Sequence, residues 1–296
     1  ENDLTKSLCP RKVIIPPVLA GYDVWYINTG AFSNKNIESV ILPETTTMIY
    51  DNAFKDNKIT NLVIPDSVMN IAESAFENNG LTSLDLGEGV TFIGTHGFYN
   101  NDITTLVLPD SLMGYGYSVF ESNKISKLTL GSVASTVGEG TFKNNEITSL
   151  VIPNSVAYIG TSTFENNKIS SLSLGSGLSY VADYAFRNNN IGSFTYANPS
   201  TTFGTGVFSN NKLINVTISN STYSIPSYAY ANNSLTSVTI PNPVSTINDY
   251  AFYNNKLTSA TISDTVTSIG ASAFEKNLLT SVTIPGLVTT IDSNAF

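Results

Sequence analysis

The chain repeats its own pattern every 22 residues. An aromatic residue recurs at this spacing from Phe32 to Phe296, with Tyr230 in one place where the others have Phe, and no insertion or deletion shifts the register. A fixed period of this length is the signature of a solenoid, in which each repeat is one coil that buries its apolar side only by stacking on its neighbours. The 296 residues are therefore interpreted as one long stack of coils rather than two ordinary domains.

Within each repeat, a short segment has the pattern of a strand. Counting from the aromatic residue as position zero, position five is Ile or Leu in all twelve repeats, and positions eight and ten are apolar between polar neighbours. A period of two is typical of a half-buried strand, and Pro or Gly at position eleven ends it in most repeats. We predict a right-handed, curved leucine-rich repeat solenoid with a parallel β-sheet on the concave face. For the rest of each coil we expect turns, short extended pieces and 3₁₀ fragments, without long helices.

Two adjacent asparagines mark the corner before this strand. Position three is Asn in eleven of twelve repeats and position two in nine. Asn tolerates the left-handed backbone and bonds to nearby backbone groups, and a column of amides can bond from coil to coil. We expect position three to point inward and position two outward. Asn167, Asn189 and Asn255 are thus interpreted as structural, together with a buried Phe164; the alternative is a continuous ligand groove of amides.

The polar residues form no pattern of a catalytic or metal site. The one histidine, His96, has no orienting partner suggested nearby, and no cluster has the spacing of a zinc, calcium or phosphate site. The net charge of -9 argues against nucleic acid or an anionic membrane as partner. No apolar run approaches the roughly 18 residues that a membrane helix needs. We expect no enzyme activity, no cofactor, no nucleic-acid partner and no membrane insertion within this segment.

One candidate binding surface is the outward side of the predicted strands. Position seven is mostly small and polar, and position nine changes along the chain from mixed residues to threonine. A long, nearly uncharged ribbon of hydroxyls suits a ligand, but it is equally a solvated strand face, because Thr favours strands. Both interpretations stay open. The candidate ligand-binding residues on this concave face are Asp85, Lys127, Thr195, Thr217, Thr239, Thr261 and Thr283.

Tyrosines on the predicted loops are the second candidate. Tyr184, Tyr228 and Tyr250 share position twenty, and Tyr115 and Tyr117 lie in the segment MGYGY, which we expect to be an irregular turn. Exposed Tyr often marks recognition surfaces. The three tyrosines at position twenty are therefore candidate ligand-binding residues of the loops.

The consensus resembles a known family of repeats. The segments LTSVTIPNPVSTINDYAF (235–252) and ITSLVIPNSVAYIGTSTF (147–164) carry an L-x-x-L-x-[IL]-P block followed by V-x-x-I and A-F or T-F. This is similar to the BspA-like (Treponema pallidum type) bacterial leucine-rich repeats, although that family often has Cys where this chain has Asn. The resemblance covers residues 32–296.

What the resemblance implies is a location and a class of function. Such proteins are typically exported and surface-attached and bind host proteins or other cells. The implied function is a secreted or cell-surface, non-catalytic binding or adhesion module for a protein or glycan ligand on host or neighbouring cells. The competing hypothesis is a structural spacer that presents another domain.

The two ends depart from the repeat. Residues 1–31 fit it loosely and contain the only Trp, Trp25, and the only Cys, Cys9, so no internal disulfide can form. We predict that they fold over the first coil as a cap, because an end coil exposes its core. The repeat domain is then 32–296, and since Phe296 begins a new coil, we expect the natural chain to continue or a neighbour to cover this end. Among the repeats, residues 187–206 depart most from the consensus.

Overall fold

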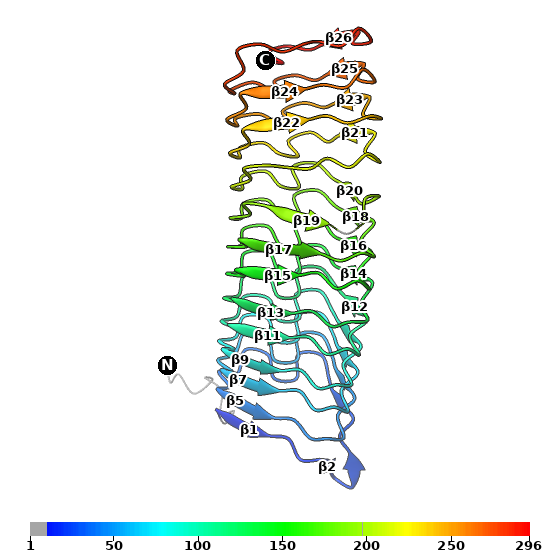
Figure 1. Ribbon diagram of the computed structural model, residues 1–296. Helices are drawn as coiled ribbons and strands as arrows, with labels where there is room; N and C mark the ends of the chain where they lie inside the picture. The colour runs from blue at the N-terminus through cyan, green and yellow to red at the C-terminus, as the bar shows by residue number, and fades with distance from the viewer. Residues whose placement is uncertain (1–10, 197) are drawn as a thin grey trace, which may run out of the picture. The chain divides into compact units, whose positions relative to one another are not determined.

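The computed structural model describes residues 11–196 and 198–296, without the side chains of Thr195 and Tyr196 (Figure 1). The chain forms two compact units, residues 1–147 (unit 1) and 148–296 (unit 2), which are described separately. Each unit is a stack of 22-residue coils with parallel strands, which confirms the predicted solenoid. The described residues contain no helix, and the expected 3₁₀ fragments are wrong, since plain turns occupy those corners. Cys9 lies outside the described residues.

In unit 1, the strands predicted at positions seven to nine are present. β7 pairs with β9 in parallel with Leu62 opposite Leu84, and β1–β5 and β11–β13 pair in the same way. The middle residue points inward, so Leu62 is only 2% exposed. These strands are β1 (Lys12–Ile14), β5 (Ser39–Ile41), β7 (Asn61–Val63), β9 (Ser83–Asp85), β11 (Thr105–Val107) and β13 (Lys127–Thr129).

Unit 1 also has a second row of strands, at positions sixteen and seventeen, which we call the second ladder. Five of its two-residue strands form one parallel sheet, and β14 (Thr136–Val137) occupies the same columns. Position seventeen points inward, and Ile49, Ile71 and Ile93 are fully buried there. The sheet consists of β4 (Tyr26–Ile27), β6 (Met48–Ile49), β8 (Asn70–Ile71), β10 (Phe92–Ile93) and β12 (Gly114–Tyr115).

The expected irregular turn at MGYGY is therefore wrong. Gly114–Tyr115 is the strand β12, paired in register with β10, and the Gly116 amide continues the ladder by donating to the Ile93 carbonyl at 2.8 Å. Tyr115 takes the inward place that Ile93 and Val137 have in the neighbouring coils.

The described part of the N-terminal segment forms an extra coil against the first repeat. β1 pairs with β5 and β4 with β6, both in parallel. Between them, β2 (Val18–Leu19) and β3 (Tyr22–Asp23) form a small antiparallel hairpin. These pairings are what a cap requires, and the proposed boundary at residue 31 stays a prediction.

Unit 2 repeats both rows of strands but with breaks. The first row forms two separate sheets: β15 (Ser149–Val151), β17 (Ser171–Leu174) and β19 (Phe194–Tyr196), then β22 (Ser237–Thr239) and β24 (Ser259–Thr261). The second row runs through β16 (Tyr158–Ile159), β18 (Tyr180–Val181), β20 (Thr202–Phe203), β21 (Ser224–Ile225), β23 (Thr246–Ile247), β25 (Ser268–Ile269) and β26 (Thr290–Ile291).

The first row breaks next to a coil whose core is built differently. Residues 215–217, which the repeat predicts as a strand, form none. In the preceding coil Phe194 replaces the usual Leu or Val, and its ring stacks on Phe208 with centroids 4.2 Å apart. The ring centroids of Phe208 and Tyr230 are 6.2 Å apart, compared with 5.3 Å for Phe252 and Phe274. The coils themselves stay joined, since the Phe208 amide donates to the Ala229 carbonyl at 3.1 Å.

The core of each unit is a stack of aromatic rings. In unit 1, Phe54 and Phe76 are fully buried, with centroids 5.1 Å apart and planes 6° from parallel. In unit 2, Phe164 and Phe186 repeat this at 5.5 Å. Burying one such side chain stabilises the fold by about 1.5–3 kcal/mol. Over the residues described, no helix is long and apolar enough to span a bilayer.

Candidate functional site

Every coil turns two corners with left-handed backbone. One is position two, where Asn188 has φ 57°, and the other is position twenty, where Tyr184 has φ 60°. Residues without Cβ, or with short polar side chains, adopt this conformation most easily. The residue type at each corner therefore shows whether the left-handed backbone there is strained.

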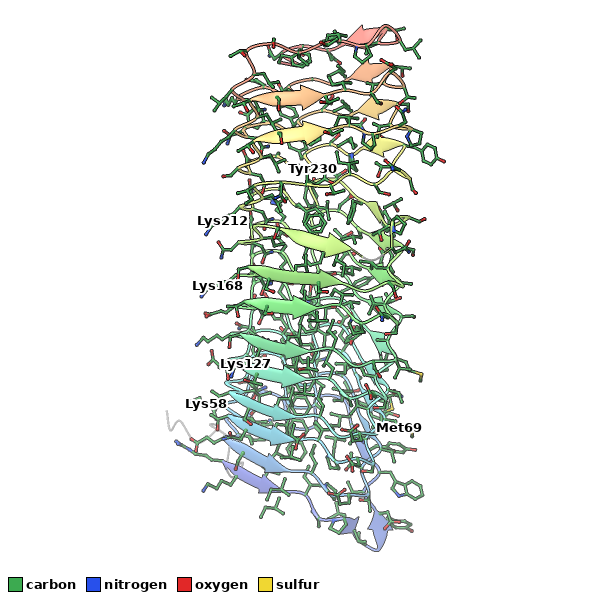
Figure 2. The ribbon with its side chains drawn as sticks, viewed as in Figure 1. Lys58, Met69, Lys127, Lys168, Lys212 and Tyr230 are labelled. Atoms are coloured by element: carbon green, nitrogen blue, oxygen red, sulfur yellow. The ribbon has the colours of Figure 1, made fainter. Side chains whose placement is uncertain are left out.

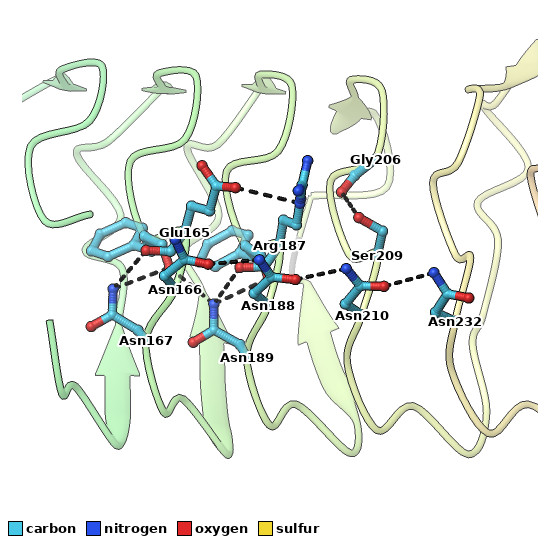
Figure 3. A network of polar contacts seen from close by, with 12 residues as sticks. Glu165, Asn166, Asn167, Arg187, Asn188, Asn189, Gly206, Ser209, Asn210 and Asn232 are labelled. Atoms are coloured by element: carbon cyan, nitrogen blue, oxygen red, sulfur yellow. Dashed lines mark hydrogen bonds and ion pairs between the residues drawn. The ribbon is translucent and has the colours of Figure 1, made fainter. Parts of the chain in front are cut away.

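At the first corner, the asparagines of position two form an amide ladder along unit 2 (Figure 3). The Asn188 Nδ2 donates to Asn166 Oδ1 at 2.6 Å, Asn210 donates to Asn188 at 2.7 Å, and Asn232 donates to Asn210 at 2.7 Å. Asn254 extends the series by donating to Asn232 at 2.8 Å. Each bond uses one of the two N–H donors of its amide, so the ladder presents a row of regularly spaced polar groups at the surface.

The neighbouring asparagines of position three point inward, as expected, and join successive coils. Asn189 is 7% exposed, and its Oδ1 accepts the Ile169 amide of the preceding coil at 3.0 Å. Its Nδ2 donates to the carbonyls of Phe164 at 2.9 Å and Phe186 at 3.1 Å. Asn255, three coils further along the chain, makes the equivalent contacts. Its Oδ1 accepts the Leu235 amide, and its Nδ2 donates to the carbonyls of Tyr230 and Phe252. Asn167, also 7% exposed, donates to the Phe164 carbonyl at 3.1 Å.

At the second corner, three tyrosines occupy a conformation that bulky residues rarely adopt. Tyr184, Tyr228 and Tyr250 have φ of 60°, 58° and 58°. In other repeats the same corner carries small or polar residues such as Ser162 and Ser272, both at φ 54°. Strained backbone of this kind is concentrated at functional sites, which makes these tyrosines candidates for a functional role.

The rings of two of these tyrosines stack. The centroids of Tyr228 and Tyr250 are 4.7 Å apart, with planes 5° from parallel. Loss of hydration, followed by the negative fields of Tyr250, Asp249 and Tyr184, raises the pKa of Tyr228. The Tyr228 phenol therefore stays neutral and able to donate a hydrogen bond at physiological pH.

The third tyrosine bounds a hollow with an arginine. The Arg187 guanidinium carbon lies 5.3 Å from the Tyr184 ring centroid, a cation–π contact, and Arg187 Nε lies 3.4 Å from Glu165 Oε1. At the same corner of the next coil stands Gly206, where a Cβ would come within 2.6 Å of the Tyr184 ring. The resulting hollow of about 300 Å³ is lined by Tyr184, Arg187, Ser209, Asn210, Tyr228, Ala231 and Asn232.

We call Tyr184, Arg187, Tyr228 and Tyr250 the tyrosine surface. It combines aromatic faces, a guanidinium group and the amide ladder, so it can bind a ligand by stacking and by directed hydrogen bonds. The sequence pattern pointed to the tyrosines but not to Arg187 or Gly206. The sequence does set Arg187 apart, because it is the only arginine after residue 11.

The strand-face candidates are not brought into one site. Asp85 in β9 and Lys127 in β13 are exposed in unit 1, and Thr239 and Thr261 are exposed on β22 and β24 in unit 2. Thr217 and Thr283 are exposed but lie outside strands, so no single continuous sheet carries the threonine column. The side chain of Thr195 lies outside the described part of the chain.

The break in the first row leaves two further hollows. They have volumes of about 210 and 470 Å³ and share Thr217, Ile218 and Ser219 in their linings. The smaller one is mostly apolar and reaches Phe203 and Tyr230. Across the described ranges, no group of three or more His, Cys, Asp and Glu side chains is placed to hold a metal ion.

Stacked coils with parallel strands, an inward Leu or Ile column and an asparagine corner define a leucine-rich repeat protein. The particular family follows from the sequence profile of the BspA-type leucine-rich repeat region, which contains six copies of the repeat. It matches residues 25–147, 92–214, 135–257 and 201–296. The chain belongs to this family.

Solved structures of three bacterial proteins are similar to this chain. A leucine-rich repeat protein from Bacteroides ovatus has a TM-score of 0.58 and 21% identity, covering 91% of this chain and 85% of that one. The pneumococcal vaccine antigen PcpA has a TM-score of 0.57 and 18% identity, covering 99% and 85%. A leucine-rich repeat protein from Eubacterium ventriosum has 0.50 and 16%, covering 88% and 82%. No curated protein matches in sequence. At these identities the similarity supports the fold alone.

Proposed function

We propose that the chain is a non-catalytic binding module of an exported, cell-surface protein, and that the tyrosine surface takes a protein or glycan ligand presented by host or neighbouring cells. The observation that carries the proposal is the tyrosine at φ near 60° in three coils, where other coils have small or polar residues. A structural role does not require these rings, because Ser162 and Gly206 form the same corner. Membership of the BspA type and similarity to a vaccine antigen support an exposed location.

The test is a binding screen followed by matched variants. The purified chain is screened against immobilised matrix proteins, host cell-surface proteins and glycans, and affinities are measured for each saturable ligand. The double variant Tyr228→Ser with Tyr250→Ser is expected to lose at least tenfold in affinity, because both aromatic faces are removed. Ser is chosen since Ser162 and Ser272 hold the same backbone. Tyr158→Ser is the control, an exposed tyrosine of unit 2 outside the tyrosine surface.

The same screen separates the competing sites. A ligand whose affinity falls with Thr239→Lys and Thr261→Lys, but not with the tyrosine variants, places the site on the strand face instead. Failure to find any saturable ligand supports a spacer, for which the coil-to-coil amide ladder and ring stack provide a regular rod-like backbone within each unit.

A further inference from the structure

Unit 1 carries an exposed apolar surface on its second ladder. Met113 is 66% exposed, Trp25 53%, Met69 52% and Phe92 44%. All three methionines of the chain and its only tryptophan lie here. Exposed apolar side chains scattered singly need no explanation, but a contiguous group on one face marks an interaction surface. We call this group the Met–aromatic face; its residues are Trp25, Tyr26, Met48, Met69, Phe92 and Met113.

The second ladder holds these side chains side by side. Met48 lies opposite both Tyr26 and Asn70 in the parallel register, and Phe92 lies opposite Asn70. The Met69 amide donates to the Thr47 carbonyl at 2.9 Å, and the Met113 amide donates to the Thr91 carbonyl at 3.0 Å. The face therefore occupies two neighbouring columns of five successive coils, with Thr47, Asn70 and Thr91 between its apolar residues, on regularly paired backbone.

Acidic residues border this strip on both sides. One column precedes the ladder at position twelve and the other follows it at position nineteen. Two of these carboxylates also brace the backbone, because Asp66 Oδ1 accepts the Glu88 amide at 2.9 Å and Asp51 Oδ1 accepts the Glu73 amide at 3.1 Å. Within the described ranges, none of them is in an ion pair. The two columns consist of Glu44, Asp66, Glu88 and Asp110, and of Asp51 and Glu73, all exposed.

Basic residues are absent from this side of the repeat. Where Lys occurs in the repeats of unit 1, it stands at positions one to seven, and Figure 2 shows Lys58 and Lys127 on the side of the first strands and Met69 on the side of the second ladder. The segments that form the strip and its borders contain six acidic residues and no Lys or Arg: 42–53, 64–75, 86–97 and 108–119. The field over the strip is therefore negative.

We propose that the Met–aromatic face binds a basic amphipathic helix of a partner protein. The apolar side of such a helix covers the methionines and aromatic rings, while its Lys and Arg side chains reach the two acidic columns. Methionine suits this role because its flexible thioether adapts to different partners. Five coils span about 19 Å, which corresponds to about 13 helical residues. A second copy of this face is a poor partner, since it would bring like charges together.

The same columns of unit 2 differ in composition. Positions fifteen and sixteen there hold exposed tyrosines, Tyr158, Tyr180 and Tyr223, but no methionine. Position twelve includes Asn154 and Ser176 rather than a row of acids. The proposed binding is therefore a property of unit 1 and does not depend on the tyrosine surface.

The experiment titrates the full chain with two synthetic 14-residue amphipathic peptides at physiological ionic strength. Both have the same leucine face, and the polar face is lysine in one and glutamate in the other. Fluorescence anisotropy of a labelled peptide gives the affinity, and the emission of Trp25 reports contact, because burying a half-exposed indole shifts its emission to the blue. The expected result is micromolar binding of the lysine peptide with a blue shift, and binding at least 30-fold weaker for the glutamate peptide.

Two variants test the two halves of the surface. Met69→Thr with Met113→Ser uses residues found in these columns in other repeats, Thr47 and Ser135, and is expected to weaken binding at least tenfold. Asp66→Asn with Glu88→Gln is expected to weaken it about fivefold and to reduce its salt dependence. Asn at 66 keeps the acceptor, as Asn154 does for the Ser176 amide at 2.9 Å. Tyr158→Thr on the second ladder of unit 2 is the control.

Three results would overturn the proposal. They are absence of binding by the lysine peptide, equal binding of both peptides, and an affinity that neither double variant changes while circular dichroism shows both to be folded.

Discussion

The inward asparagine column makes a prediction that separates two neighbouring residues of identical type. Asn189→Ala removes the acceptor for the Ile169 amide and the donor to the carbonyls of Phe164 and Phe186. Ile169 is fully buried, so water cannot replace the lost acceptor without opening the coil. An unsatisfied buried N–H costs about 1–3 kcal/mol, and each of the lost bonds contributes about 0.5–1.5 kcal/mol. With two donor bonds lost, we expect a total loss of about 2–6 kcal/mol in the free energy of unfolding.

The control is the preceding residue, Asn188. Its amide lies at the surface in the ladder and bonds only to the side chains of Asn166 and Asn210. Asn188→Gly loses these two exposed bonds but retains the left-handed backbone at φ 57° without a Cβ penalty. The expected loss is below about 1 kcal/mol, because water replaces both partners.

Two assays measure the difference. Urea unfolding followed by circular dichroism gives the global loss, and native-state hydrogen exchange gives the local one. Repeat proteins lose cooperativity along the stack, so the local reading matters more. The Ile169 amide is expected to exchange at least tenfold faster in Asn189→Ala and to change little in Asn188→Gly. Equal destabilisation by the two variants would refute the inward column as the element that joins the coils.

Three other variants test the core, a buried phenol and the tyrosine surface. Phe164→Ala removes a fully buried ring and is expected to cost about 3–5 kcal/mol; an unchanged melting curve would contradict this. The Tyr115 hydroxyl is buried and has no hydrogen-bond partner among the described residues, and burial raises its pKa above the usual value of 10.0. The unfolded chain therefore releases this proton first, so stability is full below pH about 10 and falls as pH rises further. In Tyr115→Phe this alkaline loss should shrink in denaturant titrations from pH 8 to 11, with equal or higher stability at pH 8. Gly206→Ala places a Cβ against the Tyr184 ring, so ligand affinity should fall at least threefold although no tyrosine is changed, whereas unaltered affinity would exclude the hollow as part of the site.

Much of this fold is predictable from the residues that recur at the same position of every repeat. Each inward position has one requirement, which is to fill the same space in every coil. Ile169 and Phe164 stand in columns that must fill the same space in every coil, so the residue type barely varies. The second ladder was predictable only as extended pieces. Its strands have two residues each, such as Asn70–Ile71, which is too short for a period of two to be recognised.

The exposed surfaces were harder to predict for different reasons. The left-handed corner at position twenty carries Ser, Asn, His, Gly and Tyr in different coils. Its left-handed backbone therefore could not be predicted from a preference for one residue type. The Met–aromatic face alternates between two columns: Met48, Met69, Phe92 and Met113 are separated by 21, 23 and 21 residues. A search at the strict 22-residue period therefore misses it. The loss of strand at Thr217 was not predictable in the same way, because Thr217 keeps the 22-residue period although residues 215–217 form no strand.

The corner at position twenty shows how such a chain can acquire a binding surface without changing its fold. Ser162 and Tyr228 have nearly the same φ, 54° and 58°, so the backbone accepts either residue and the difference lies outside the coil. Strain at one corner is tolerated because the buried ring column and the inward asparagines fix the coil on both sides of it. Each outward column is thus free to change while the inward columns hold the stack. Under the two proposals, a ligand would be recognised by the residues along a column rather than by a motif within one repeat. Substitutions at Tyr228 or Met69 should accordingly alter binding with little change in the free energy of unfolding, the reverse of substitutions at Phe164 or Asn189.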